Sequence, residues 1–281
     1  MRQYLKLLRV RHYIKNVLVF LPMFFGGVIF EERRILNAFL GFIAFSFLSS
    51  VVYIINDYRD IEKDRKHSTK KFRPLASGAV SKRSAVMCAA ILFIVVIGIS
   101  FLIGNYIAVA CLMGYLLLNI LYSMGLKNKP IIDVVILASG FVIRVFYGGL
   151  ITGVTISKWL YLVVVTGSLY MGLGKRRNEL RAQTDTRESL KYYNESFLDK
   201  NMYVCVSLVN VFYALWSIEM PNPRMIWTVP LFLILFMCYS LDIEGDSDAD
   251  PVEVIVHNKT LISLVIAYAI CIFLLLYVFR I

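Results

Sequence analysis

The chain has 281 residues, of which 59% are hydrophobic, and its mean hydropathy is +0.69. Soluble domains are about 45–50% apolar, so this composition excludes an ordinary soluble domain and indicates a protein that crosses the bilayer several times. A net charge of +11 would suit nucleic acid, but the basic residues lie between long apolar runs, which argues against a nucleic-acid partner.

Nine apolar segments are long enough to span the hydrocarbon core of a lipid bilayer. We therefore expect an all-α, polytopic membrane protein in which residues 1–281 form one domain, a bundle of nine transmembrane helices. The predicted helices cover residues 14–30, 36–56, 84–104, 105–125, 131–151, 158–174, 201–219, 225–242 and 260–280.

The loops of this bundle differ strongly in charge. With the N-terminus inside, the loops at about 57–83, 125–130, 174–200 and 242–259 lie on the same side as residues 1–15. These segments hold most of the 30 lysine and arginine residues. The positive-inside rule then predicts that the N-terminus and these loops are cytoplasmic and that the C-terminus lies outside, in an inner or plasma membrane.

The first segment, residues 1–16, is basic and amphipathic, and it leads into the first predicted helix. Anchoring at the membrane interface explains this pattern. However, Lys15 and Asn16 come where the helix enters the bilayer, and burying them there is costly unless they face a polar cavity. The residues alone leave both interpretations open.

The second predicted helix ends in a run of short side chains that carry oxygen ligands. They are Asn56, Asp57, Asp60 and Asp64. On one continuous helix, at about 100° per residue, all four share a face, and hard oxygen ligands of this kind suit Mg²⁺. The alternative is a solvated helix end whose carboxylates pair with neighbouring bases such as Arg59 and Lys63.

Further candidates for phosphate binding follow at predicted cytoplasmic boundaries. Arg73 precedes Pro74 in a long loop, and an arginine there can bind a phosphate through two N–H groups. Most other bases of this loop are explained by membrane topology. Tyr122 and Lys127 end the fourth helix, where they either reach the same cavity or serve as an interfacial anchor and flank.

The fifth predicted helix carries Asp133 near its start and Arg144 near its middle. The two share a face but lie about 16 Å apart along the axis, too far to pair. An intramembrane arginine marks a buried partner or a functional interior. We favour a structural partner on another helix for Arg144.

The basic sequence Lys175-Arg176-Arg177 follows the sixth helix, with Glu179 close behind. It predicts an anion-binding cradle or, alternatively, only topology charge. Paired carboxylates are missing there, so no second metal site is expected. The last cytoplasmic loop is acidic from Asp242 to Glu253. Its spacing overlaps a calcium loop, but we favour a cap over the cytoplasmic face.

These motifs resemble a known family. Asn56-Asp57-x-x-Asp60-x-x-x-Asp64 resembles the first acidic motif of the UbiA superfamily of intramembrane prenyltransferases, nine-helix bundles whose cytoplasmic aspartates hold Mg²⁺ on a diphosphate. The resemblance covers essentially the whole chain. Other short motifs are similar to the decaprenyl-phosphate phosphoribosyltransferase branch. They are Arg11-x-x-x-Lys15-Asn16, Phe72-Arg73-Pro74, Tyr122-Ser-x-x-Leu126-Lys127 and, in place of a second Asp-rich motif, Leu173-Gly174-Lys175-Arg176-Arg177-x-Glu179-Leu180.

The resemblance implies a Mg²⁺-dependent transferase of the cell envelope. Such an enzyme moves 5-phosphoribosyl from phosphoribosyl diphosphate to a polyprenyl phosphate and releases diphosphate, at an active site on the cytoplasmic face. The implied catalytic residues are Asp57 and Asp60, and the implied metal ligands are Asn56, Asp57, Asp60 and Asp64. The implied phosphate-binding residues are Lys15, Arg73, Lys127, Lys175, Arg176 and Arg177, supported by Asn16, Tyr122 and Glu179. A homo-oligomer is compatible with this reading.

Two other functions fit part of the pattern. A UbiA-type enzyme that moves a polyprenyl group from its diphosphate to an aromatic or other small acceptor shares the first motif, but the missing second acidic motif argues against it. A membrane transporter needs charged residues deep in several helices, whereas this sequence places Asp133 and Arg144 in one.

Overall fold

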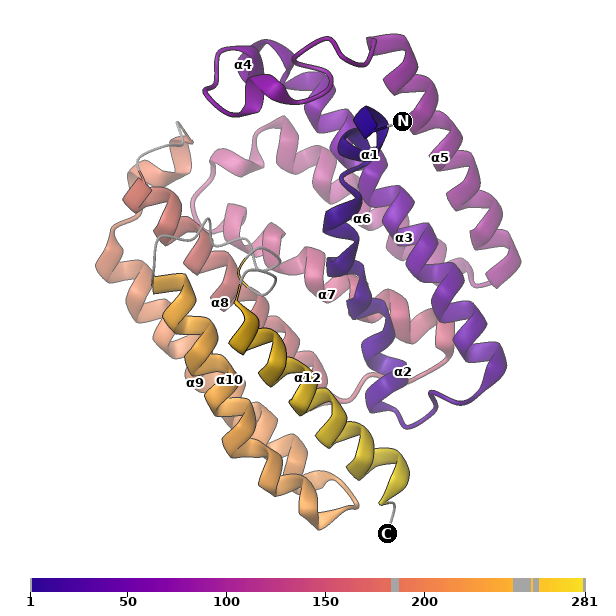
Figure 1. The fold of residues 1–281 in the computed structure, drawn as a ribbon, viewed down its shortest axis with the longest axis vertical. Helices are drawn as coiled ribbons and strands as arrows, with labels where there is room; N and C mark the ends of the chain where they lie inside the picture. Colours follow the sequence, from indigo (N-terminus) through magenta and orange to yellow (C-terminus); the bar gives the residue numbers. More distant parts are fainter. Residues whose placement is uncertain (1, 183–186, 245–253, 255–257, 280–281) are drawn as a thin grey trace. The chain divides into compact units, whose positions relative to one another are not determined.

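A computed structural model of the chain describes residues 2–182, 187–244, 254 and 258–279. These residues form helices and turns, and none of them lies in a strand, which confirms the all-α prediction (Figure 1). The chain divides into two compact units. Unit 1 comprises Met1–Met124 and Ile143–Thr155, and unit 2 comprises Gly125–Val142 and Ile156–Ile281.

Among the described residues, seven helices are long and apolar enough to cross a membrane. They are Glu32–Arg59, Lys82–Ile103, Tyr106–Met124, Ile132–Thr152, Glu195–Glu219, Pro223–Glu244 and Lys259–Val278. The segment predicted at 158–174 is the start of α8 (Lys158–Ala182), which continues through the basic motif. The segment predicted at 14–30 is not one helix. The nine-helix count therefore stays a prediction.

Unit 1 begins with α1 (Arg2–Leu8), which is followed by η1 (Val10–Phe20) and α2 (Leu21–Phe25). η1 is an eleven-residue 3₁₀-helix, although runs of this type longer than three or four residues are uncommon. Its end packs so closely on α7 (Ile132–Thr152) that a Cβ at Gly148 would collide with the backbone of Val19. The first predicted helix is therefore replaced by a differently wound segment held against its neighbours.

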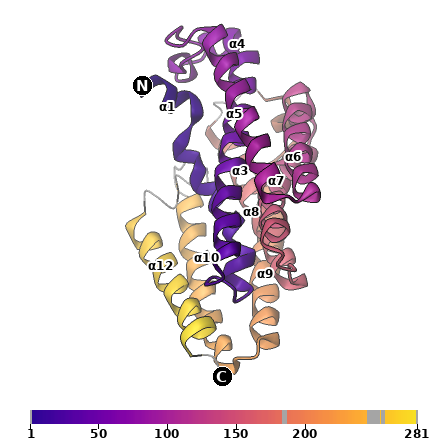
Figure 2. The same ribbon diagram turned by 90° about the vertical axis from the view of Figure 1, so that its right-hand side faces the viewer.

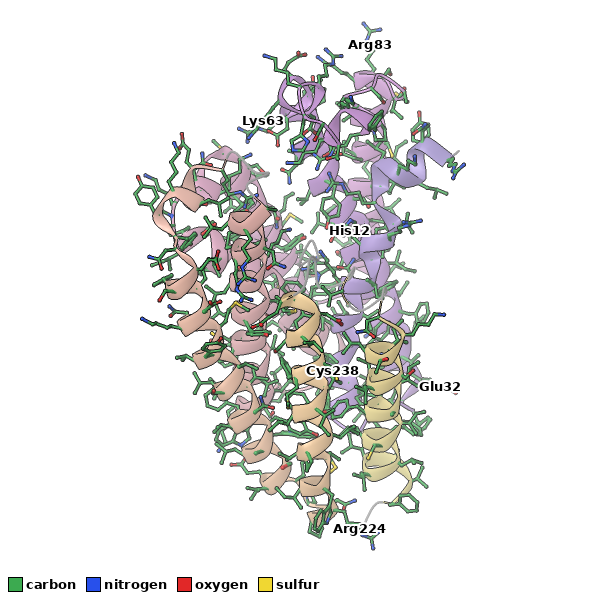
Figure 3. The ribbon with its side chains drawn as sticks, turned by 60° about the vertical axis from the view of Figure 1, so that its left-hand side comes forward. His12, Glu32, Lys63, Arg83, Arg224 and Cys238 are labelled. Carbon is green, nitrogen blue, oxygen red and sulfur yellow. The ribbon has the colours of Figure 1, made fainter. Side chains whose placement is uncertain are left out.

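The rest of unit 1 is built around the long helix α3 (Glu32–Arg59), which lies beside α5 (Lys82–Ile103) in both views (Figures 1 and 2). The remaining elements are α4 (Ile61–Arg65), η2 (Lys70–Phe72), α6 (Tyr106–Met124) and the second half of α7. Phe45, Leu48 and Tyr147 are fully or almost fully buried in the core of this unit. Figure 3 shows Lys63 and Arg83 at one end of the unit and Glu32 toward the other.

Unit 2 contains the first half of α7 and a helical bundle. Its elements are η3 (Leu126–Asn128), α8, η4 (Glu188–Tyr192), α9 (Glu195–Glu219), η5 (Pro223–Thr228), α10 (Val229–Glu244), α12 (Lys259–Phe273) and η6 (Leu274–Val278). α8 and α9 pack along each other, and Leu198, Ile243 and Leu261 are fully buried in the core. Of the acidic loop predicted between Asp242 and Glu253, residues 245–253 lie outside the described residues.

Candidate active site

The acidic motif lies at a break between two helices. α3 ends at Arg59 and α4 begins at Ile61, with Asp60 in the turn between them (φ −92°, ψ 8°). The single continuous face predicted for the motif is therefore interrupted. Backbone hydrogen bonds still follow the helical pattern across the break, since Asp60 N donates to Asn56 O at 3.0 Å and Asp64 N donates to Asp60 O at 2.7 Å.

Two of the three aspartates are brought together and buried. Asp57 is 2% exposed and Asp64 is 3% exposed. One nitrogen of Arg73, Nη1, lies 3.1 Å from Asp57 Oδ1 and 2.7 Å from Asp64 Oδ2. The two carboxylates therefore flank a single guanidinium group, and the loop after α4 is tied back onto the end of α3. Asp60 itself is half-buried in the turn.

Arg9 is a second cation at this cluster, and the sequence analysis missed it. Its Nη2 lies 2.6 Å from Asp57 Oδ1, and its guanidinium lies 4.7 Å from the centre of the Tyr53 ring. Its backbone is left-handed (φ 51°, ψ 46°), a conformation that costs about 1–2 kcal/mol for a residue with a Cβ. The strained turn between α1 and η1 thus directs Arg9 at the buried carboxylate.

Hydrogen bonds to α3 hold the segment that carries Arg9. Tyr13 shares a 2.7 Å hydrogen bond with Ser50 on α3, and the Ser50 hydroxyl donates to the carbonyl of Leu8 at 2.8 Å. Farther along η1, the Asn16 amide donates to Ser46 Oγ at 2.9 Å. Serines on successive turns of α3 therefore fix the start and the middle of the first segment.

Arg144 completes this support from α7. Its Nε donates to Asn16 Oδ1 at 2.7 Å, and its guanidinium lies 4.8 Å from the centre of the Phe45 ring. Arg144 is 5% exposed, so it binds a neighbouring segment, in agreement with the structural role favoured from the sequence. Asn16, expected to support the site, is 1% exposed and links Arg144 to α3 through Ser46.

Of the other predicted residues of unit 1, Asn56 and Tyr122 lie near the ends of α3 and α6, and Lys15 lies within η1. Asn56 Oδ1 accepts a hydrogen bond from the hydroxyl of Ser123 on α6. Tyr122 precedes Ser123 and is half-buried, and Lys15 is half-buried on η1 beside Asn16. α6 is thus linked to the end of α3 at the acidic motif.

The donor chemistry of the motif fits a hard divalent cation. Asp57, Asp64 and the intervening Asp60 offer only oxygen, which Mg²⁺ prefers. In the described part of the chain, however, no three Asp, Glu, His or Cys residues are already arranged to hold a metal ion. Arg9 and Arg73 supply the positive charge that two buried carboxylates require.

In unit 2, the basic motif of α8 is engaged by carboxylates. Arg176 is 0% exposed, its Nε lies 2.7 Å from Asp133 Oδ2, and it also pairs with Glu179. Arg177 is almost fully buried, and its Nε lies 2.6 Å from Asp199 Oδ1. The sequence predicts an anion-binding cradle at these residues, and in the structure both guanidinium groups already face carboxylates.

Asp133 organises the loop that follows α8. It accepts hydrogen bonds from the Ser189 hydroxyl at 3.0 Å and from the Tyr193 hydroxyl at 2.7 Å. Burial and the hydrogen bond to Asp133 raise the pKa of Tyr193 to about 12, so this hydroxyl stays protonated and donates at neutral pH. Lys127 on η3 and Lys175 on α8 are half-buried.

Comparisons with known proteins show which family the chain resembles. Residues 19–243 match the UbiA prenyltransferase family. The chain is similar to the decaprenyl-phosphate phosphoribosyltransferase of Corynebacterium glutamicum, with 34% identity over 98% of this chain and 86% of the relative. It is also similar to the decaprenyl-phosphate phosphoribosyltransferase of Mycobacterium tuberculosis, with 31% identity over 94% of this chain and 90% of the relative.

Solved structures share the fold. A UbiA homolog from Archaeoglobus fulgidus bound to GPP and Mg2+ superimposes with a TM-score of 0.75, over 96% of this chain and 99% of that chain. The sequences are 20% identical. The likeness extends over nearly the whole of both chains and establishes a common helical architecture.

Proposed function

Because the chain belongs to the UbiA prenyltransferase family, we propose that it transfers the 5-phosphoribosyl group of phosphoribosyl diphosphate to a polyprenyl phosphate. The observation that carries this proposal is the similarity to decaprenyl-phosphate phosphoribosyltransferases, which are 31–34% identical over 94–98% of this chain. The polar cluster at the end of α3 supports it, because both substrates of the reaction are phosphates.

The protein is an integral membrane protein, as the seven long apolar helices among the described residues and its family indicate. We place the acidic motif and the N-terminus on the cytoplasmic side of an inner or plasma membrane, and the C-terminus outside. The distribution of lysine and arginine supports this orientation.

We assign the metal site to the acidic motif. Asp57 and Asp60 are the proposed catalytic ligands, and Asn56 and Asp64 complete or support the set. Bound there, Mg²⁺ would neutralise charge on the diphosphate leaving group. The burial of Asp57 and Asp64 supports this assignment, since charge interactions are stronger where water is excluded.

Basic residues of both units are the proposed phosphate-binding groups. Arg9 and Arg73 already lie at Asp57, so a diphosphate held at the carboxylates is within reach of both guanidinium groups. Lys15 follows on the anchored segment, and Lys127 and Lys175 are the candidates from unit 2. Arg176 and Arg177 belong to the same proposed set, and their carboxylate partners support a role in positioning the Lys175 region.

The proposed reaction needs positioning more than proton transfer. An oxygen of the polyprenyl phosphate is already anionic and attacks C1 of the ribose. A new C1–O bond forms as the C1–O bond to diphosphate breaks, and diphosphate leaves with the electron pair. The two anionic substrates repel each other. The guanidinium and ammonium groups offset this repulsion and hold the reacting groups in contact.

A membrane assay tests this function. Membranes that contain the protein would receive labelled phosphoribosyl diphosphate, a polyprenyl phosphate and Mg²⁺, and label is expected to enter the lipid phase. Omission of the polyprenyl phosphate should abolish the transfer, and so should omission of Mg²⁺. Incorporation only when a prenyl diphosphate and an aromatic acid are supplied would refute the proposal and favour the prenyltransferase alternative.

Arg9→Gln is expected to lower kcat/KM for phosphoribosyl diphosphate by about 10- to 100-fold, since hydrogen bonds to charged groups contribute about 1.5–3 kcal/mol. Calorimetry should show correspondingly weaker binding of phosphoribosyl diphosphate with Mg²⁺. The matched control is Arg11→Gln, which removes an exposed arginine of the same segment and should behave like the parent. Equal effects of both substitutions would show that Arg9 contributes only surface charge.

A further inference from the structure

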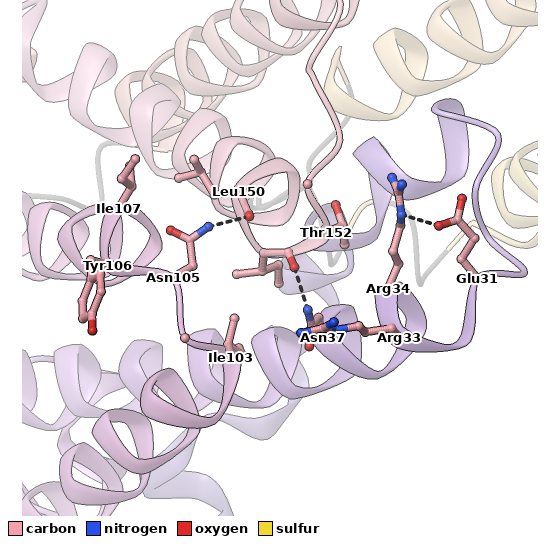
Figure 4. A pocket seen from close by; sticks show the side chains of 13 residues that line it. Glu31, Arg33, Arg34, Asn37, Ile103, Asn105, Tyr106, Ile107, Leu150 and Thr152 are labelled. Carbon is pink, nitrogen blue, oxygen red and sulfur yellow. Dashed lines mark hydrogen bonds and ion pairs between the residues drawn. The ribbon is translucent and has the colours of Figure 1, made fainter.

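Unit 1 has a pocket of about 590 Å³ at the end opposite the acidic motif. It lies between the start of α3, the turn from α5 to α6 and the end of α7 (Figure 4). Arg33 at this pocket and Asp57 are separated by about 36 Å along α3, at about 1.5 Å per residue. This exceeds the hydrocarbon thickness of about 30 Å, so the pocket belongs to the other membrane interface.

The polar floor of the pocket is already satisfied. Asn105 Nδ2 donates to the carbonyl of Leu150 at 2.8 Å, and Asn37 Nδ2 donates to the carbonyl of Ile151 at 3.0 Å (Figure 4). These two carbonyls end α7, where the helix dipole is negative. Because the asparagine amides donate hydrogen bonds to these two carbonyls, the carbonyl oxygens repel an anion in the pocket less strongly.

The charged rim carries a net positive charge. Arg34 Nε lies 2.6 Å from Glu31 Oε2, so these two residues largely compensate each other. Arg33 is exposed on the same rim. The three side chains together leave one positive charge, which matches the single negative charge of a phosphodiester.

Apolar side chains next to the rim indicate that the ligand also has an apolar part. Phe101 and Leu102 at the end of α5, and Ile107 at the start of α6, are more than two-thirds exposed. In a bilayer these positions face acyl chains. Tyr106 is also strongly exposed, as expected for an aromatic residue at the headgroup level.

We propose that this pocket binds the phosphodiester headgroup of an anionic glycerophospholipid of the leaflet opposite the active site. Arg33 contacts the phosphate, and the acyl chains follow Phe101 and Leu102 toward the bilayer centre. The site is separate from the reaction, so it would hold a structural lipid rather than a substrate.

Lipid binding to the purified, delipidated full chain tests this proposal. Phosphatidylglycerol is expected to raise the Tm and to be retained in native mass spectra, whereas diacylglycerol and inorganic phosphate should do neither. Arg33→Gln should weaken phosphatidylglycerol binding by about tenfold. Arg224→Gln, which removes an exposed arginine of unit 2, should leave the binding unchanged.

A substitution of opposite sign sharpens the test. Glu31→Gln removes the negative charge beside Arg34 and should strengthen phosphatidylglycerol binding. Equal binding by the parent and Arg33→Gln would overturn the proposal, as would an equal response to diacylglycerol. A Tm increase with inorganic phosphate alone would show a soluble anion at the pocket and would overturn the assignment to a lipid.

Discussion

Asp57→Asn is expected to reduce phosphoribosyl transfer by at least about 100-fold, while the protein still folds. Asp57 is the residue on which the proposed site converges, because Arg9 and Arg73 both contact its Oδ1. Removal of one preorganised charge-stabilising group typically costs about 10²–10³-fold in kcat. Asparagine keeps the shape of the side chain but removes the charge needed for a metal ion and for the two arginines.

Glu62→Gln provides the matched control for this prediction. Glu62 lies on α4 within the same acidic segment, but its side chain is 77% exposed and pairs with Arg65. Exposed ion pairs contribute about 0–1 kcal/mol, so both activity and Tm should stay close to the parent. Transfer by Asp57→Asn within a few-fold of the parent would show that this carboxylate is not a metal ligand.

Asp133→Asn is expected to lower the free energy of unfolding by about 3–5 kcal/mol, the usual effect of removing one partner of a buried ion pair. Asp133 and Arg176 both have side chains that are 0% exposed. Without the carboxylate, Arg176 keeps a buried charge, and Ser189 and Tyr193 lose their charged acceptor. Thermal unfolding in detergent would measure the decrease.

Two further variants separate buried charge from loss of packing. Asp133→Asn combined with Arg176→Gln should recover part of the stability, because it removes a buried guanidinium that has lost one of its two carboxylate partners. Asp199→Asn should have a smaller effect, since Asp199 is 27% exposed beside Arg177. If the double variant is less stable than Asp133→Asn alone, the ion pair is not the reason for the loss.

The acidic motif was predictable from the sequence because its residues are close along the chain. Asp57, Asp60 and Asp64 recur at helical spacing, and short-range geometry alone brings them near one end of α3. The break at Asp60 was not predictable, because a turn within an otherwise helical pattern depends on how the loop folds back. Arg73 holds the loop in this position by pairing with both Asp57 and Asp64.

Arg9 was missed because its role depends on contacts across 48 residues and on an unusual winding of η1. On a regular α-helix, nothing distinguishes it from Arg11. The pairing of Arg176 was missed for a related reason, since its partner Asp133 belongs to another helix. A sequence shows which side chains are charged. Tertiary packing decides whether each of them faces solvent, substrate or a buried counter-ion.

The winding of η1 also sets how far the first segment reaches. Eleven residues of 3₁₀-helix rise about 2.0 Å each, and the five residues of α2 rise about 1.5 Å each. Together they extend about 30 Å, the thickness of the hydrocarbon core, although the same residues would be too short as an α-helix. Rewinding η1 to an α-helix would shorten it by about one helical turn and draw Arg9 away from Asp57. The hydrogen bonds from the serines of α3 therefore fix the position of Arg9 relative to Asp57.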